Sequence, residues 1–193
     1  MSKADIMNAG SNRLKEYYST TVVPRLQETL GFKNRLEVPK VSKIVVNVGV
    51  KEGAGDSKVL QSIARVLEAI TGQVPVKRMA RKSIAGFKLR EGMHIGVSVT
   101  LRRASMYAFL DKLVNLALPK VRDFQGVPTK FDGRGSYNLG IKEWNIFPEA
   151  ESAGAGERML GLNVTICTTS QSDEHAQALL KELGMPFRRT TSK

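Results

Sequence analysis

The spacing of apolar residues divides the chain into short strands and amphipathic helices. Strict alternation over residues 41–50 and 95–101, and a similar run over 160–168, predicts three strands. Helical spacing over residues 59–70 and 106–117, and again after residue 172, predicts three amphipathic helices. A further helix is predicted over residues 12–30, where Pro24 should produce a kink or divide the segment into two short helices.

Polar and glycine residues mark where these elements begin and end. Helix N-caps are expected at Asp56 or Ser57, at Ser105, and at Ser170 or Ser172. Helix ends are expected at Gly31, Gly72, Pro119 and Gly184. A short strand is predicted over residues 74–78, and residues 131–141 are predicted to form a glycine-rich turn that leads into another strand.

The order of the central elements is βαββαβ, with one hairpin-like segment inserted. This order predicts an α+β fold of the split βαβ (ferredoxin/RRM-like) type, with an antiparallel sheet, helices on one face and an additional N-terminal helix. We expect a single domain over residues 13–189, with flexible tails at 1–12 and 190–193.

The sheet face without helices is expected to stay open, and its residues are informative. They are mostly small hydrogen-bonding groups with a few cations: Lys43, Val45, Asn47, Ser98, Thr100 and Arg102, with Asn163 and Thr165 added if the last strand is in register. RRM domains stack unpaired bases on aromatic residues at such positions, and these positions hold none. The face therefore suits the 2′-hydroxyls and phosphates of a structured RNA, with a merely solvated sheet face as the alternative.

The charge of the chain points to a polyanionic partner. Lys and Arg number 30 against 18 Asp and Glu, a formal net charge of +12, which favours nucleic acid ahead of an anionic membrane. The single cysteine, Cys167, excludes an intrachain disulfide framework and fits a reducing cytoplasm. The chain shows no signal-peptide pattern and no apolar run of the roughly 18–20 residues that a membrane helix needs.

The basic loop over residues 77–90 carries six positive charges and no negative charge. It joins two predicted strands and should project as an anchored hairpin whose middle, residues 83–87, is mostly apolar and contains Phe87. Cations around a small apolar tip favour a projecting hairpin that binds the backbone phosphates of a nucleic acid. The alternative is a mobile loop with Phe87 tucked into the core.

Catalytic and cofactor motifs are sparse, and we expect neither a cofactor nor a metal. His94 and His175 lack partners at ligand spacing, and Cys167 lies in a predicted strand as a small packing residue. Gly49, Gly53 and Gly55 stand between a strand and a helix, so a nucleotide-binding enzyme that uses the Gly49–Gly55 loop is the alternative function. However, Lys58 stands where the Rossmann pattern needs a third glycine, and the P-loop triplet is missing.

Several long segments resemble bacterial ribosomal protein L five. They are residues 38–50, 69–73, 80–90, 99–102, 119–126, 136–141 and 186–188. The resemblance runs from about residue 17 to residue 189 and implies a structural ribosomal protein rather than an enzyme. Members of this family lie in the central protuberance of the large subunit, beside its other proteins and large-subunit rRNA, and help attach 5S rRNA. They also contact P-site tRNA and a small-subunit head protein of the S thirteen family.

The resemblance also implies roles for individual residues. Asn47, Gln73 and Thr100 match positions that grip 5S rRNA, and the open face adds Lys43, Ser98 and Arg102 to this rRNA-binding set. The expected tRNA-binding residues are Arg78, Met79, Ala80, Arg81, Lys82, Ser83, Ile84, Ala85, Gly86 and Phe87. The intersubunit bridge is mapped more loosely, to Lys112, Arg134, Tyr137 and Lys142.

Overall fold

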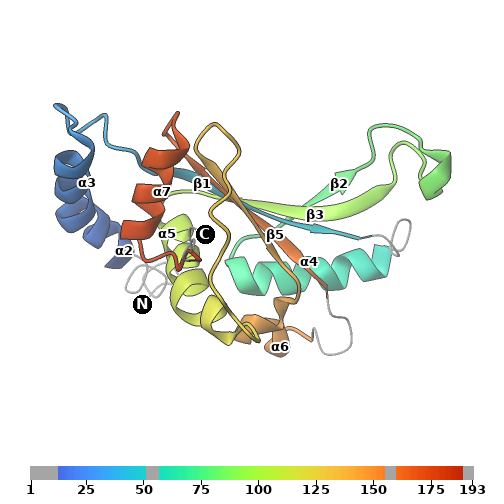
Figure 1. Ribbon diagram of the computed structural model, residues 1–193. Helices are drawn as coiled ribbons and strands as arrows, with labels where there is room; N and C mark the ends of the chain where they lie inside the picture. Colours follow the sequence, from blue (N-terminus) through green and yellow to red (C-terminus); the bar gives the residue numbers. More distant parts are fainter. Residues whose placement is uncertain (1–12, 51–56, 155–159, 189–193) are drawn as a thin grey trace. The chain divides into compact units, whose positions relative to one another are not determined.

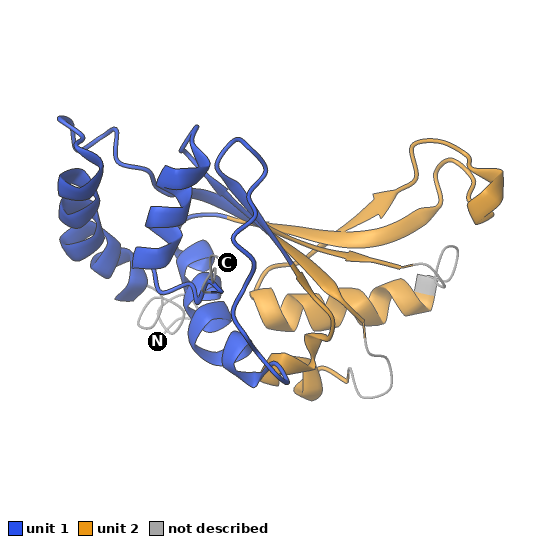
Figure 2. Ribbon diagram, in the orientation of Figure 1, with its two compact units in different colours: residues 1–44, 102–139, 165–193 blue, residues 45–101, 140–164 orange. Residues whose placement is uncertain are grey.

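The structure, a computed structural model, describes residues 13–50, 57–154 and 160–188. The chain forms two compact units (Figure 2). Unit 1 comprises residues 1–44, 102–139 and 165–193, and unit 2 comprises residues 45–101 and 140–164. The predicted tails and most of the Gly49–Gly55 loop lie outside the described residues.

The strands form one five-stranded sheet in the order β2-β3-β1-β5-β4 (Figure 1). The bounds are β1 Val41–Gly49, β2 Val76–Met79, β3 His94–Leu101, β4 Ser136–Ile141 and β5 Leu162–Thr168. The order β2-β3-β1-β5 is that of a split βαβ fold, and β4 is the inserted strand, added at the edge beside β5. The predicted α+β class, with an antiparallel sheet and an N-terminal helix, is therefore confirmed.

Unit 1 contains most of the helices. They are α2 Arg13–Tyr17, α3 Val23–Leu30, α5 Arg103–Lys112 and α7 Asp173–Glu182, with π-helical turns at Tyr18–Val22 (η1) and Leu113–Ala117 (η3) and a 3-10 turn at Leu118–Lys120 (η4). Helix α2 contacts α5, and α3 contacts α7. Their buried residues, among them Leu26, Phe109, Leu110 and Leu179, make up much of this unit's core.

The N-terminal helix accommodates Pro24 through the π-helical turn η1. Proline donates no N–H and crowds the carbonyl four residues earlier, which would break a regular α-helix. Here the Val23 N–H donates to Tyr18 O, five residues back, so the helix widens just before the proline and continues into α3. Gly31, with φ of 69°, ends α3 as predicted.

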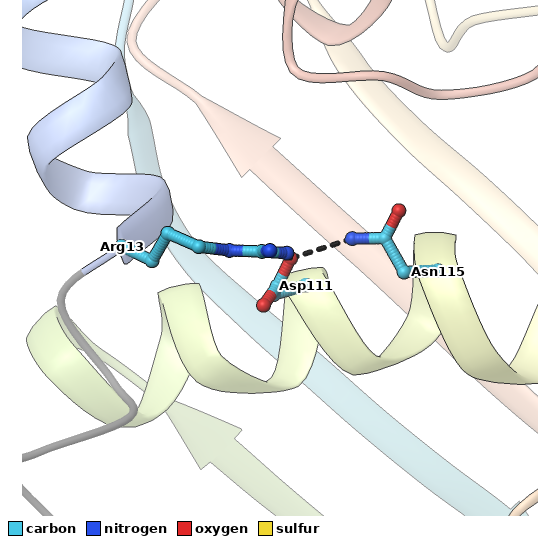
Figure 3. A network of polar contacts seen from close by, with 3 residues as sticks. All are labelled: Arg13, Asp111 and Asn115. Atoms are coloured by element: carbon cyan, nitrogen blue, oxygen red, sulfur yellow. Dashed lines mark hydrogen bonds and ion pairs between the residues drawn. The ribbon is translucent and has the colours of Figure 1, made fainter.

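Helix α2 is linked to α5 by a small polar network (Figure 3). An Arg13 Nη donates to Asp111 Oδ1 at 2.8 Å, and Asn115 Nδ2 donates to the same oxygen at 2.6 Å. The Tyr18 hydroxyl donates to Pro39 O at 3.0 Å, and its ring lies 6.3 Å from that of Tyr107. The contacts of Arg13 and Tyr18 join residues far apart in sequence, so α2 and η1 are integral parts of unit 1.

Unit 2 is a layer of strands with helices on one side. Its helices, α4 Ser57–Thr71 and α6 Pro148–Ser152, lie on the same side of the strands (Figure 2), and α4 packs on β3. A short 3-10 turn, η5 Trp144–Ile146, precedes α6. The apolar faces meet between α4 and the strands, where the side chains of Val46, Val48, Leu60, Ile63, Leu67, Val97 and Val99 are buried.

Some local predictions were wrong. Helix α5 begins at Arg103 with Arg102 in the N-cap position, so Ser105 lies inside the first turn and is not the cap. The reason is that β3 ends at Leu101, which leaves one residue between strand and helix. The alternation predicted for residues 41–50 is not strict, because Val41 and Ile44, three positions apart, are both buried. Strand β2 begins at Val76, two residues later than predicted.

Candidate nucleic-acid interface

The open face predicted from the sequence corresponds to one side of the strands in unit 2. We call this surface the polar face, and it consists of Asn47, Arg78, Ser98 and Thr100. The Val50 N–H donates to Ile95 O at 2.9 Å, and this bond sets the antiparallel pairing of β1 and β3. Continued along both strands, the pairing puts Asn47 opposite Ser98. Asn47 and Thr100 are half-buried, on the strand side opposite the buried valines and α4.

Ser98 differs from its prediction. It was expected to be open to solvent, but it is 4% exposed, and its Oγ accepts a hydrogen bond of 2.7 Å from Arg78 Nε. In the register of β2 and β3, Val76 pairs with Ser98 and Arg78 pairs with Gly96. Arg78 therefore reaches diagonally across the strand pair and covers the serine. The alternation of β2 could have indicated this contact, because it places Arg78 on the Ser98 side.

Small side chains keep the polar face flat. At Gly96, a Cβ would lie 2.7 Å from Val48 O, so the backbones of β1 and β3 approach closely there. Strands β1, β2 and β3 contain no phenylalanine, tyrosine or tryptophan. The face offers hydroxyl, amide and guanidinium groups to a ligand and no platform for base stacking.

The other predicted rRNA-binding residues are arranged differently. Gln73 is exposed in the turn between α4 and β2, and its backbone N–H donates to the Thr71 hydroxyl at 3.4 Å, while that hydroxyl donates to Leu67 O at 2.7 Å. Lys43 is half-buried and Arg102 is exposed, and both belong to unit 1. The structure thus brings Asn47, Ser98 and Thr100 together in one unit.

The basic loop forms the predicted hairpin between β2 and β3. At its base the Ala80 N–H donates to Met93 O at 2.8 Å, and the Gly92 N–H donates to Ala80 O at 3.0 Å. An antiparallel bridge between Ile84 and Leu89 closes the tip around a 3-10 turn, η2 Ala85–Phe87. These backbone bonds give the loop a defined path away from the sheet (Figure 1).

The hairpin tip displays an apolar ring among cations. Phe87 is 72% exposed, so the alternative that its ring is tucked into the core is wrong. Ile84 and Met79 are also exposed, as are Arg81 and Lys82. Ala80 is buried, so it anchors the hairpin rather than forming part of the displayed surface.

The predicted bridge segment begins with a tightly hydrogen-bonded loop in unit 1. Asp173 Oδ2 and Oδ1 accept from the N–H groups of Gly133 at 3.0 Å and Gly135 at 2.8 Å. Asp132 Oδ1 accepts from the N–H groups of Arg134 at 2.8 Å and Ser136 at 2.9 Å. The backbone bonds from Ser136 and Arg134 lower the pKa of Asp132. The loop therefore presents the exposed Arg134 side chain from a defined backbone.

Tyr137 is fully buried, which removes it from any contact surface. Its hydroxyl donates to Pro128 O at 2.7 Å, and its ring packs against Phe131 and Phe187 at centroid distances of 5.0 and 5.6 Å. Burial raises the pKa of Tyr137 to about 12. Of the other predicted bridge residues, Lys112 is half-buried in unit 1 and Lys142 is exposed in unit 2.

The described residues offer little for other chemistry. In residues 13–50, 57–154 and 160–188, no group of three or more His, Cys, Asp or Glu side chains is placed to hold a metal. No described helix is long and apolar enough to cross a membrane. His175 packs its ring edge-on against Phe32 at 5.3 Å, and Cys167 is a half-buried free thiol in β5.

Comparison with known proteins gives consistent matches over nearly the whole chain. A profile described as ribosomal protein L5 matches residues 34–90, and one for the C-terminus of the same family matches residues 94–187. The large ribosomal subunit protein uL5 of Rippkaea orientalis is 55% identical over 177 residues, which is 91% of this chain and 98% of that protein. The uL5 proteins of Synechocystis sp. and Geobacter sulfurreducens are each 54% identical, over 92% and 91% of this chain and 99% and 98% of their own lengths.

Proposed function

Since the chain belongs to the ribosomal protein L5 family and is a structural constituent of the large ribosomal subunit, not an enzyme, we propose that it attaches 5S rRNA through the polar face of unit 2. Family membership removes the nucleotide-binding enzyme as an alternative.

The observation that carries the proposal is the chemistry of the polar face. Structured RNA is recognised through 2′-hydroxyls and phosphates, and these groups need hydrogen-bond donors and acceptors on a flat surface. Asn47 supplies both a donor and an acceptor, and Thr100 supplies a hydroxyl on the neighbouring strand, diagonally across from Asn47. Both residues lie on strands that are paired on both sides, so their backbone positions are fixed before RNA binds.

The expected energies follow from this geometry. If RNA buries the Asn47 amide or the Thr100 hydroxyl, truncation to alanine leaves a polar group of the RNA unpaired, at about 1–3 kcal/mol per site. A loss of this size corresponds to roughly a 5- to 150-fold weaker affinity. The folded state should be little affected, because no described residue forms a hydrogen bond with either side chain that these alanines would break.

The experiment is a binding titration of Asn47→Ala and Thr100→Ala against isolated 5S rRNA at several salt concentrations. Gln61→Ala is a matched control, because Gln61 is an exposed, uncharged residue on α4, the helix that covers the opposite side of these strands. We expect both face variants to bind more weakly than the control. Wild-type affinity for both of them would remove the polar face as the 5S rRNA site.

The hairpin is proposed to contact P-site tRNA. Its exposed cations and its exposed Phe87 fit a phosphate backbone with an unpaired base or a shallow groove nearby. Replacing Arg81 and Lys82 with alanine should preserve 5S rRNA binding and weaken tRNA binding to reconstituted ribosomes. Loss of 5S rRNA binding in this double variant would contradict the assignment of the two surfaces to different RNAs.

The intersubunit contact is proposed to use Arg134, with Lys142 and Lys112 as further candidates, and a small-subunit head protein of the S thirteen family as partner. The rigid loop around Arg134 supports this, because a charged side chain on a fixed backbone needs less ordering on binding. Arg134→Ala should reduce subunit association without changing 5S rRNA affinity. Association at the wild-type level would exclude Arg134 from the bridge.

A further inference from the structure

Arg78 begins the basic hairpin in the sequence, but its side chain belongs to the polar face. Its Nε donates to Ser98 Oγ at 2.7 Å. Ser98 stands opposite Asn47 in the pairing of β3 with β1, so the serine lies between the arginine and the asparagine. The sheet order β2-β3-β1 makes Arg78, Ser98 and Asn47 a polar row across three adjacent strands.

The hydrogen bond from Nε orients the guanidinium group. A free arginine on an edge strand samples many rotamers, whereas this one is held at its Nε while the side chain as a whole stays exposed. No described acidic residue forms a salt bridge with it. The two Nη groups are therefore free to form the paired N–H contacts that match a phosphate.

We propose that Arg78, oriented by Ser98, binds a backbone phosphate of 5S rRNA on the polar face, and that Ser98 is a positioning residue for this contact. The proposal rests on the proposed 5S rRNA function of the face. It moves Arg78 from the tRNA-binding group, where its place in the sequence had put it, to the rRNA-binding group. It also explains how the Ser98 hydroxyl, which is too buried to contact RNA itself, can contribute to binding.

The test compares salt dependence as well as affinity. Each phosphate neutralised by a cation adds about 0.9 to the slope of log affinity against log salt, so Arg78→Ala should lower the slope by about one. We expect its affinity to fall roughly tenfold or more at moderate salt. Ser98→Ala removes no charge, so it should weaken binding roughly three- to tenfold with an unchanged slope.

Lys77→Ala is the matched control. Lys77 lies next to Arg78 on the same edge strand and carries the same charge, but it pairs with Val97, whose side chain is buried on the side that α4 covers. Its side chain therefore points away from the polar face. We expect its removal to change the affinity and the slope much less than removal of Arg78. Arg78→Lys should restore the salt-dependence slope but recover only part of the affinity. Lysine keeps the charge, but it has no Nε–H to donate to Ser98 and no pair of parallel N–H donors for a phosphate.

Distinct results separate this proposal from the proposed function. If the Arg78 and Ser98 variants bind 5S rRNA as well as the wild-type protein while Asn47→Ala binds more weakly, the polar face is supported and the proposed role of Arg78 is wrong. Equal losses for Lys77→Ala and Arg78→Ala would overturn the specific contact in favour of diffuse attraction. Intact 5S rRNA binding with reduced tRNA binding in Arg78→Ala would return the residue to the hairpin surface. No 5S rRNA binding by the wild-type protein would instead defeat the proposed function itself.

Discussion

At Gly96 the structure predicts a clear effect of adding a single carbon atom to the polar side of the sheet. It lies in β3 on the polar side, and a Cβ there would stand 2.7 Å from the carbonyl oxygen of Val48 and 3.6 Å from Cα of Gly49. Ordinary carbon–oxygen contacts between strands are about 3.3–3.6 Å. Gly96→Ala therefore forces β1 and β3 apart by several tenths of an ångström, since neither contact atom belongs to a movable side chain.

The expected cost of Gly96→Ala is that of overpacking a rigid site, about 1–3 kcal/mol of unfolding free energy. In a chain of 193 residues this corresponds to a fall in Tm of about 2–4 °C for each kcal/mol. Gly49→Ala is the matched control on the facing strand, because a Cβ at Gly49 would meet nothing within 4 Å. That variant should be neutral or up to about 1 kcal/mol more stable, because alanine restricts the unfolded chain.

Urea unfolding followed by tryptophan fluorescence measures this difference. Trp144 is the only tryptophan, is 2% exposed and lies in unit 2, the unit that contains both glycines. Because the strain falls between the strands that carry Asn47 and Ser98, Gly96→Ala should also weaken 5S rRNA binding. Equal stabilities of the two glycine variants would refute the close approach of the strands and with it the geometry of the polar face.

Polar contacts in unit 1 lead to two further predictions. Tyr137→Phe leaves Pro128 O without its hydroxyl donor and should cost about 1–2 kcal/mol near pH 8 in urea unfolding. The pKa of Tyr137 is raised to about 12, so its contribution to the unfolding free energy is full below about pH 10 and is lost as the pH rises toward 12. A difference in unfolding free energy between wild type and Tyr137→Phe that stays constant over this range would contradict the assignment. Asp173→Asn should speed amide hydrogen exchange at Gly133 and Gly135 while α7 keeps its protection, and unchanged exchange would show that the carboxylate does not hold the loop.

Periodicity predicted the strands and helices well because it depends on neighbours within one element. Val46 and Val48 in β1, and Val97 and Val99 in β3, are buried as their alternation indicates. The βαββαβ order then restricted the sheet to a split βαβ arrangement. Gly31 and Gly72 end their helices with positive φ, a conformation that glycine adopts without steric cost. The single-domain boundary at residues 13–189 stays a prediction.

Predictions failed where an outcome depends on an atom supplied from elsewhere in the chain. Ser98 has the alternation of an open-face residue, yet Arg78 from the neighbouring strand covers it. Tyr137 stands in a polar, glycine-rich segment, yet it is buried between Phe131 and Phe187. For Tyr137, its alternation with Leu139 and Ile141 in β4 was a local signal for burial that the bridge assignment did not use. For Ser98, the signal lay in the neighbouring strand β2 and not in its own segment.

Local residue patterns were sufficient for the fold class, the strand and helix positions, the family and the excess of positive charge. The assembled fold was needed to show that Arg78 joins the sheet face, that Phe87 is displayed, and that Asp173 holds the loop around Arg134. The physical reason is range: helix and strand preferences act over a few residues, whereas a hydrogen bond from Arg78 to Ser98 or from Gly133 to Asp173 exists only once distant segments pack side by side.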